Sequence, residues 1–318
     1  MNPLSIVLPI RNGMNFLVQS KKSLESNLGP RDEIILIDDG STDGTGDFLR
    51  NWSHESNQVN LITGPGRGLV EALNLGIKES SNSWIARFDV DDEYPSERLS
   101  LQRAAINPDS VAIFSDYEFW GSGAPYLGII PSPIDPHATS ISLIASQRTA
   151  HPSVIFSKFA FNEVGMFRNE DFPAEDLSLW LRLTRVGKIH SLPTVLLRYQ
   201  LAPNSITSLQ RQESIKKTKK LIEEIGIYQS DIDGIFVNIE NIIDSYRSST
   251  LGLHRQILML RELGLMKDAG LLNATQSKIL RNEKAKITLN VRSYGIAFQI
   301  INERRLRRNF RKVISQSQ

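Results

Sequence analysis

The first two hundred residues alternate between short apolar runs and longer segments whose apolar positions have helical spacing. The apolar runs are continuous rather than alternating, which is typical of strands buried on both faces of a parallel sheet. We expect strands at residues 4–10, 33–40, 59–63, 84–89 and 111–117. Strand, helix, strand in this order predicts an α/β fold, with a mixed, mostly parallel sheet flanked by helices and joined by right-handed crossovers.

After about Pro203 the pattern becomes helical throughout. Helical spacing covers residues 211–226, 234–246, 253–272 and the terminal segment 294–314. We therefore predict two parts, an α/β domain at residues 1–205 and a helical C-terminal region at residues 206–318.

The terminal segment 294–314 mixes apolar and basic residues. Its apolar members include Ile296, Phe298, Ile300, Ile301, Leu306 and Phe310, and its basic members are Arg304, Arg305, Arg307, Arg308, Arg311 and Lys312. A basic amphipathic helix can lie on an anionic membrane surface. A solvated helix packed on the α/β domain, or a frayed tail, explains the same pattern, so both interpretations stay open.

Composition narrows the class of protein. The 318 residues are 40% hydrophobic and 23% charged, as in soluble globular proteins, and the net charge of +2 does not indicate nucleic-acid binding. The absence of cysteine excludes disulfides and thiol nucleophiles and agrees with a reducing cytosol. The first residues lack a basic region and Pro9 interrupts their apolar run, so we expect no signal peptide. No stretch reaches the ~18 apolar residues of a membrane span, which favours a cytoplasmic protein.

Four acids fall within five positions of "RFDVDDEYP" (residues 87–95), directly after an expected strand: Asp89, Asp91, Asp92 and Glu93. Like charges this close repel, so something must offset the repulsion. Asp89 and Asp91 would share a side in extended backbone, and carboxylates suit Mg²⁺ or Mn²⁺ ions that are shared with substrate phosphates. We therefore expect Asp89 and Asp91 to serve a metal. Asp92 and Glu93 could equally belong to the start of the helix expected at residues 95–103.

A second pair of acids ends the strand in "LIDDGSTDGT" (residues 36–45). Gly40 permits a tight turn and Asp43 could cap the next helix. A capped turn alone does not explain both Asp38 and Asp39, because adjacent strand residues face opposite sides. Since ligands bind at the carboxyl ends of such strands, we expect at least one of the two to contact a ligand such as a base or ribose.

A third acidic pair, Glu175 and Asp176, opens the helix expected in "FPAEDLSLWLRLTRVG" (residues 172–187). Acids at a helix start are favoured by the helix dipole, which is explanation enough at most helices. A carboxylate there that faces a cleft can also act as a general base.

Two smaller signals remain. Residues 64–69, "GPGRGL", form a glycine-rich turn before a helix, where Arg67 could meet phosphate or stack on a base. The turn lacks the Lys-Ser/Thr of a P-loop, which disfavours a nucleoside triphosphatase. His151 precedes an expected strand, and the roles of third metal ligand, acceptor contact and structural histidine all stay open.

Taken in order, these segments resemble the large inverting glycosyltransferase family two, with its Rossmann-like GT-A fold. The matching elements are "SIVLPIRNG", "IILIDDGSTDGT", "ALNLGIKESSNSWIARFDVDD" and "HPSVIFSK…FNEVGMFRNEDFPAEDLSLWLRL", followed by "LLRYQ". The resemblance covers about residues 4–205, and it is to bacterial members that build lipopolysaccharide, capsule or exopolysaccharide. It makes residues 1–205 a nucleotide-sugar-binding catalytic domain.

The resemblance implies roles for individual residues on the donor side. Pro9 and Asn12 would lie beside the nucleotide, with Arg11 fitting the position between them. Asp38 would bind the base, with Asp39 close by. Arg67 matches a region that touches the base or the diphosphate.

The family's Asp-x-Asp corresponds to Asp89, nearer the ribose, and Asp91, the direct metal ligand. Asp176 matches the catalytic base, with Glu175 beside it. "RYQ" departs from the commoner Tyr-Arg pairing, so no role is carried onto Arg198 or Gln200.

The expected activity is metal-dependent, inverting transfer from a nucleotide-diphosphate sugar, a UDP-sugar above all, to a glycan or lipid-linked saccharide. One base and one divalent metal (Mn²⁺ or Mg²⁺) suffice, whereas a glycoside hydrolase needs two facing carboxylates. The basic C-terminus would hold the enzyme on the inner face of the cytoplasmic membrane.

Two alternatives are weighed against this activity. A sugar nucleotidyltransferase would want a glycine-rich basic first loop, which residues 8–16 lack. A catalytically inactive nucleotide-binding module is disfavoured by the intact acids Asp39, Asp89, Asp91 and Asp176.

Overall fold

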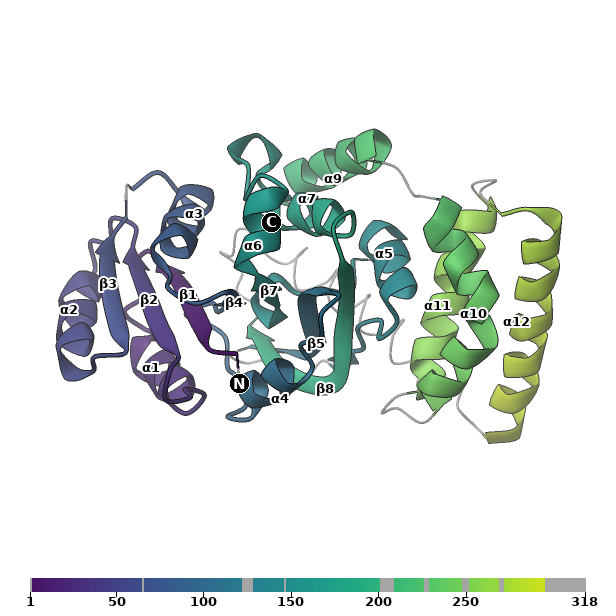
Figure 1. Cartoon of the computed structure of the whole chain (residues 1–318), viewed down its shortest axis with the longest axis horizontal. Helices are drawn as coiled ribbons and strands as arrows, with labels where there is room; N and C mark the ends of the chain where they lie inside the picture. The colour runs from purple at the N-terminus through teal and green to yellow at the C-terminus, as the bar shows by residue number, and fades with distance from the viewer. Residues whose placement is uncertain are drawn as a thin grey trace.

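The computed structural model describes residues 2–64, 66–121, 128–145, 147–200, 209–225, 229–247, 252–268 and 272–294. One eight-stranded sheet lies at the centre of the α/β part, with helices on both of its faces (Figure 1). Its strands are β1 (Leu4–Ile10), β2 (Glu33–Asp38), β3 (Val59–Thr63), β4 (Trp84–Arg87), β5 (Ser110–Trp120), β6 (Ile129–Ile130), β7 (Ile155–Ser157) and β8 (Lys188–Gln200). Their order is β3-β2-β1-β4-β7-β5-β6, and β8 pairs with β5.

Strand direction decides which chain segments meet. β1 pairs in parallel with β2 and β4, and β2 pairs in parallel with β3. β7 is antiparallel to both β4 and β5, so those two strands point the same way, and β8 is parallel to β5. The carboxyl ends of β1, β2, β3, β4, β5 and β8 therefore share one edge of the sheet, hereafter the carboxyl edge. The amino end of the reversed strand β7 reaches the same edge.

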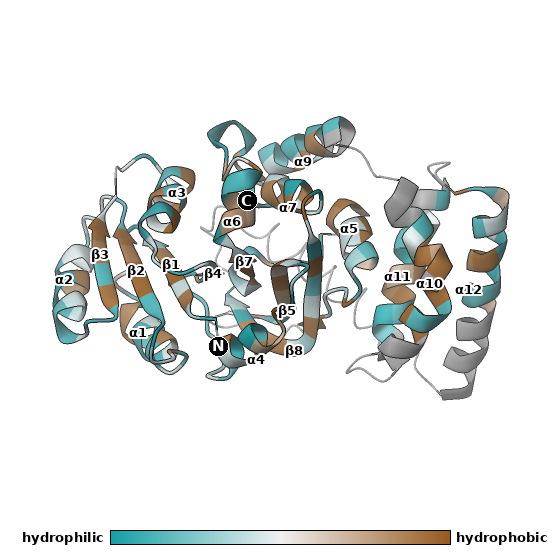
Figure 2. Ribbon diagram, in the orientation of Figure 1, coloured by the Kyte–Doolittle hydropathy of each residue, from teal (hydrophilic) through white to brown (hydrophobic). Residues whose placement is uncertain are grey.

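Each face of the sheet has its own apolar core. α1 (Leu17–Glu25), α2 (Thr45–Glu55) and α4 (Arg98–Ala104) cover one face. The other face carries α3 (Leu69–Glu79), α5 (Pro136–Ala145), α6 (Lys158–Glu163) and α7 (Glu175–Leu183). Burial on both faces explains why the strands read as continuous apolar runs, which Figure 2 shows as brown strands between helices.

Four helices follow in the C-terminal region: α9 (Arg211–Ile225), α10 (Gln229–Arg247), α11 (Gly252–Asp268) and α12 (Ala274–Tyr294). α9 lies against α7, whereas α10, α11 and α12 form a third core together with α5 (Figure 1). α5 therefore belongs to two cores. Leu143 packs in the core between the sheet and α3, α6 and α7, whereas Ala138 and Ile141 pack among the C-terminal helices.

Two buried ion pairs fasten α11 to the sheet region. Arg148 Nε and Nη2 donate to the two carboxylate oxygens of Glu262 at 2.8 and 3.0 Å. Arg255 pairs with Asp116 on β5, and both side chains are 1% exposed. Asp116 also accepts a hydrogen bond from Ser132 N at 2.9 Å. Buried charges with such complete pairing fix how α11 sits against the sheet.

The α/β class with its mostly parallel sheet and helical C-terminal region is confirmed, and so are the five expected strands. β2 and β4 end at Asp38 and Arg87, each two residues earlier than expected, and the helix expected from residue 95 begins only at Arg98. The pattern did not reveal β6 or the 13-residue β8. The domain boundary near residue 205 stays a prediction, because residues 201–208 lie outside the described part of the chain. The basic segment 295–314 lies outside it too. Over the residues that the structure does describe, no helix is long and apolar enough to cross a membrane.

Replacing Glu262 by alanine should lower the free energy of unfolding by ~3–5 kcal/mol, because it leaves the buried Arg148 guanidinium without its carboxylate. Chemical denaturation of the purified variant measures this. Asp109→Ala is the matched control, since it removes an exposed ion pair with Lys188 and should cost less than ~1 kcal/mol. A double change to Arg148→Met and Glu262→Leu should recover much of the loss. Equal effects of the two single changes would contradict the proposed role of burial.

Candidate functional site

The predicted site residues come from chain segments that end at the carboxyl edge. Asn12 follows β1, Asp38 is the last residue of β2 with Asp39 directly after it, and Asp89 and Asp91 follow β4. His151 lies in the short 3₁₀-helix His151–Ser153 that leads into the reversed strand β7. α7 runs back into β8, so its first residues, Glu175 and Asp176, also lie at this edge.

The two acids that end β2 both have partners inside the protein. Asp39 is buried and accepts hydrogen bonds from Gly66 N at 2.8 Å and from Gly68 N at 2.9 Å. Asp38 accepts one from Ser41 N at 3.0 Å. A Cβ atom at residue 64 would lie 2.9 Å from Asp39 Oδ1, so the glycine there permits the close approach of the loop. Asp39 therefore shapes the glycine-rich turn, while Arg67 in that turn is exposed.

Asn12 connects the loops after β1 and β2. Its backbone lies in the left-handed region at φ 55°, its N donates to Ser41 Oγ at 2.9 Å, and its Oδ1 accepts from Thr42 N at 2.8 Å. Pro9 pairs with Ile37 in the β1–β2 register. Its nitrogen faces the β4 side, where β4 has already ended, so no ladder hydrogen bond is lost. These contacts shape the loops after β1 and β2, and the nucleotide-binding roles of both residues stay predictions.

Asp43 does not cap α2 in the strict sense. The cap position is Gly44, at φ 90°, and the Asp43 carboxylate accepts from Thr45 N and Thr45 Oγ1 at 3.1 and 2.6 Å. Asp43 thus stabilises the same turn from one residue further upstream.

The loop between β4 and α4 contains Asp89, Asp91, Asp92 and Glu93 and is called the acidic loop below. Acids near its two ends have separate cationic partners. Arg87 Nη2 donates to Asp89 Oδ1 at 2.6 Å, and Arg198 Nη1 donates to Glu93 Oε2 at 2.8 Å. The prediction that Asp92 and Glu93 start a helix is wrong, because α4 begins at Arg98.

Asp92 is instead buried. Its carboxylate accepts a hydrogen bond from Gln200 N at 2.8 Å and lies 3.5 Å from Tyr94 Oη. Burial, together with the charges of Asp89 and Asp91, raises its pKa well above the usual range.

Asp91 differs from Asp89, Asp92 and Glu93 in its hydrogen bonding. Within the described residues its carboxylate has no hydrogen bond or ion pair to another residue, and it is only partly buried. Burial, with the Asp89 charge second, raises its pKa to about 6. A carboxylate left without a protein cation in this position is free to meet a ligand from solvent.

Arg87 lies at the centre of these acids although it is 2% exposed. Burial raises the pKa of four carboxyls, Asp91, Asp92, Glu175 and Asp176, and the Arg87 charge opposes that rise in all four. The sequence does contain a signal for this residue, because an arginine inside an apolar strand must be paired when it is buried.

Glu175 and Asp176 begin α7 in different surroundings. Glu175 is 5% exposed, and burial, reinforced by the Asp176 charge, raises its pKa to about 8. Asp176 is partly exposed, and burial raises its pKa above the ordinary value. Asp89 also acts on Glu175 electrostatically, which ties this pair to the acidic loop. The arrangement provides an accessible carboxylate, Asp176, beside a carboxyl that keeps its proton at neutral pH.

His151 packs against the rings of Phe167 and Trp180, with centroids 5.4 and 5.7 Å away. Its Nε2 is buried and has no hydrogen-bond partner among the described residues. Burial, with the Arg87 charge second, lowers its pKa well below the usual range, so the ring is neutral. No three His, Asp or Glu side chains in the described part of the chain form a metal-binding group, so the metal role of His151 stays a prediction.

The acidic loop nevertheless fits a divalent cation of the Mg²⁺ or Mn²⁺ type. Such ions are commonly held by one or two carboxylates together with substrate phosphates, so a cage of three protein ligands is not required. Asp91 offers an unpaired carboxylate, whereas one oxygen of Asp89 is already bound to Arg87. The geometry therefore favours Asp91 over Asp89 as the direct ligand.

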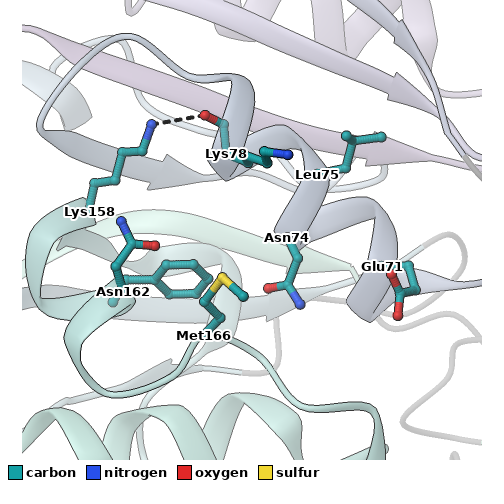
Figure 3. Close-up of a pocket in the computed structure, with 8 residues that line it drawn as sticks. Glu71, Asn74, Leu75, Lys78, Lys158, Asn162 and Met166 are labelled. Carbon is teal, nitrogen blue, oxygen red and sulfur yellow. Dashed lines mark hydrogen bonds between the residues drawn. The ribbon is translucent and has the colours of Figure 1, made fainter.

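A cavity of about 550 Å³ lies elsewhere, between α3 and α6 (Figure 3). None of the predicted site residues lines it. Several of its polar groups already bind the protein: Asn74 bonds the backbone of Phe167, and Lys158 Nζ donates to the carbonyls of Lys78 and Ser80. This cavity is therefore distinct from the group of predicted site residues.

Comparison with known proteins agrees with this architecture. Residues 5–138 match the model of the family "Glycosyl transferase family 2". Residues 5–138 therefore form a domain of that family. The match contains the loops after β1, β2 and β3 and the acidic loop, and the chain is accordingly a glycosyltransferase enzyme with a GT-A fold.

Curated relatives carry the same family of activity. An uncharacterized glycosyltransferase of Haemophilus influenzae is 24% identical over 252 residues, which are 76% of this chain and 78% of that protein. The putative teichuronic acid biosynthesis glycosyltransferase TuaG of Bacillus subtilis is 23% identical over 227 residues, 70% of this chain and 88% of TuaG. A longer glycosyltransferase of Rickettsia bellii is matched over only 26% of its length.

Solved structures share the fold. Staphylococcus aureus TarS residues 1–349, in complex with UDP-GlcNAc, superposes with a TM-score of 0.57 at 16% identity, covering 98% of this chain and 92% of that one. The mannosyltransferase PcManGT of Pyrobaculum calidifontis, in complex with GDP-Man and Mn²⁺, gives a TM-score of 0.57 at 14% identity over 89% of this chain and 79% of its own.

Replacing Glu175 by glutamine should make the protein more stable than the wild type at pH 8, by ~2–4 kcal/mol, and leave it nearly unchanged at pH 5. The pKa of Glu175 is raised to about 8 in the folded state, against ~4.3 in an unfolded chain. The wild type therefore loses stability as pH rises between these values, and glutamine removes that loss. Urea denaturation at pH 5, 6.5 and 8 measures the difference. A gap independent of pH would show that Glu175 ionises normally.

Proposed function

We propose that this glycosyltransferase is metal-dependent and inverting, and that it moves a sugar from a nucleotide-diphosphate donor, a UDP-sugar, to a glycan or lipid-linked saccharide. The observation that carries the proposal is the placing of two carboxylate sets, the acidic loop after β4 and the Glu175–Asp176 pair on α7, around Arg87. The acidic loop suits a metal-bound diphosphate, and the Glu175–Asp176 pair suits a general base.

In the proposed reaction Asp176 accepts the proton of the acceptor hydroxyl. The hydroxyl oxygen forms a bond to the anomeric carbon while the bond from that carbon to the diphosphate oxygen breaks, and the nucleoside diphosphate leaves from the opposite face. A divalent cation at Asp91, when bound, supplies Lewis-acid stabilisation of the leaving diphosphate. Direct displacement inverts the anomeric centre.

The donor would lie along the loops after β1, β2 and β3, where Asn12, Asp38, Asp39 and Arg67 stand. The complexes of TarS with UDP-GlcNAc and of PcManGT with GDP-Man and Mn²⁺ support a nucleotide sugar and a divalent metal as the kind of ligand. TuaG, named for teichuronic acid biosynthesis, supports a role in cell-surface polysaccharide synthesis.

The proposal also includes the location of the enzyme in the cell. An acceptor on a lipid carrier would bring the enzyme to the inner face of the cytoplasmic membrane, and the basic residues 304–312 suit contact with anionic lipid. Those residues lie outside the described part of the chain.

Asp176→Asn should lower kcat by at least ~100-fold, because asparagine cannot accept the acceptor proton. Asp91→Asn should lower kcat and weaken activation by Mn²⁺. Transfer from a panel of UDP-sugars to oligosaccharide acceptors measures both. Asp109→Asn is the control and should keep wild-type rates, because this exposed carboxylate pairs with Lys188 beside the amino ends of β5 and β8, away from the carboxyl edge. Near-wild-type transfer by folded Asp176→Asn and Asp91→Asn proteins would exclude the mechanism.

The rate of transfer should fall on the acid side with an apparent pKa above the usual ~3.9 of aspartic acid. The base works only when ionised, and burial raises the pKa of Asp176. The pH profile of kcat at saturating donor, metal and acceptor measures this limb. A rate that stays flat down to pH 4 would rule out Asp176 as the base.

A further inference from the structure

The last residues of β8 bind the acidic loop through its backbone. Glu93 N donates to Arg198 O at 3.1 Å and Arg198 N donates to Glu93 O at 2.9 Å, which makes an isolated antiparallel bridge. Two residues further on, Gln200 N donates to Asp92 Oδ1 at 2.8 Å. The loop that contains Asp91 is therefore fastened to a strand more than 100 residues away in the sequence.

The Arg198 side chain adds a charged layer to the same junction. Its Nη1 donates to Glu93 Oε2 at 2.8 Å and its Nε donates to Glu118 Oε1, on β5, at 2.7 Å. The guanidinium carbon lies 5.6 Å from the centroid of the Trp120 ring, and Trp120 Nε1 donates to Arg198 O at 3.1 Å. One guanidinium thus joins the loop, β5 and β8.

Charge explains why this junction needs a cation. The Glu93 and Glu118 side chains are only 23% and 15% exposed, so their mutual repulsion is poorly screened by water. Asp92 and Asp91 are the next acids along the loop. Without the Arg198 guanidinium, Glu93 and Glu118 would repel each other, and only the bonds from the β8 backbone would hold this end of the loop.

The loop is fixed at both ends and left open in the middle. Arg87 holds Asp89 at the start, and Arg198 holds Glu93 at the finish. Asp91 lies between them with no partner among the described residues. An arginine can hold two acids at once through its planar fork, which a lysine cannot do equally well.

We propose that Arg198 is a positioning residue that holds the acidic loop so that Asp91 presents its carboxylate to a divalent cation and the donor diphosphate. This inference rests on the proposed function, because it assumes that Asp91 binds the metal. It assigns a role to the end of β8, which the sequence left without one.

The test compares Arg198→Gln with Lys188→Gln. Lys188 forms an exposed ion pair with Asp109 at the other end of the same β5–β8 pair, which makes it a matched control. In Arg198→Gln, amide hydrogen exchange in residues 88–95 should accelerate by at least ~10-fold. The melting temperature should stay close to that of the wild type, since the Arg198 side chain is 46% exposed and the backbone bridge between residues 93 and 198 remains. Lys188→Gln should leave the exchange of this loop unchanged.

Calorimetric titration of Mn²⁺ into the protein with saturating UDP gives the functional readout. Arg198→Gln should bind Mn²⁺ about 10-fold more weakly than the wild type, with UDP affinity in EDTA within ~2-fold of wild type. Arg198→Lys should recover part of the loss, because it keeps the charge but not the fork. A merely structural residue would change the melting temperature without this selective loss of metal affinity.

Unchanged loop exchange in Arg198→Gln would overturn the proposal, and so would accelerated exchange with wild-type Mn²⁺ affinity. A wild-type protein that takes up no Mn²⁺ with UDP would refute the metal step of the proposed function, and with it the role of Arg198 toward Asp91. The exchange data would still show whether Arg198 holds the loop, so the two failures are distinguishable.

Discussion

Negative charge gathered at one edge of the sheet is the constraint on which this site depends. Asp89, Asp91, Asp92 and Glu93 follow β4 at this edge, and Glu175 and Asp176 open α7 there. Burial makes their repulsion expensive, as the raised pKa values of Asp91 and Glu175 show. The protein offsets the repulsion with two arginines and a backbone amide, whereas the Asp91 carboxylate has no hydrogen bond or ion pair to another of the described residues. That residual imbalance is what a divalent cation would correct.

The reversed strand β7 makes this gathering possible. In a wholly parallel sheet, the segment before a strand starts at the amino edge, away from the ligand. Because β7 is antiparallel to β4 and β5, its amino end brings His151 to the carboxyl edge. The same reversal places β5 and β8 beyond it in the direction of β4, so that Arg198 can reach Glu93. One strand reversal thus joins β1 to β4 with β5 and β8 in a single sheet whose parallel strands end at one edge.

The sequence was a good guide where apolar runs are long and local. β1 and β3 have the bounds that their runs predicted, and the acids at the ends of β2 and β4 stand at the expected edge. It failed where partners are distant along the chain. The pairing of Glu93 with Arg198 and of Asp92 with Gln200 spans 105 and 108 residues, and no spacing rule encodes it. Asp92 and Glu93 therefore looked like helix-start residues, although both serve the loop. The importance of Arg87 could have been predicted, because it is a charged residue inside an apolar strand. Nothing in "RYQ" indicated that Arg198 would pair with Glu93.

The sharing of α5 between two cores bears on how such a chain could change in evolution. Leu143 of α5 belongs to the sheet's core while Ala138 and Ile141 belong to the core of the C-terminal helices, and α11 reaches Asp116 and Arg148 through buried charges. A new C-terminal region could therefore not be exchanged at residue 205 alone. It would have to match an apolar helix face and complete two ion pairs that begin upstream, around residues 116–148. The helical region and the segment of the α/β domain on which it packs would have to be exchanged together.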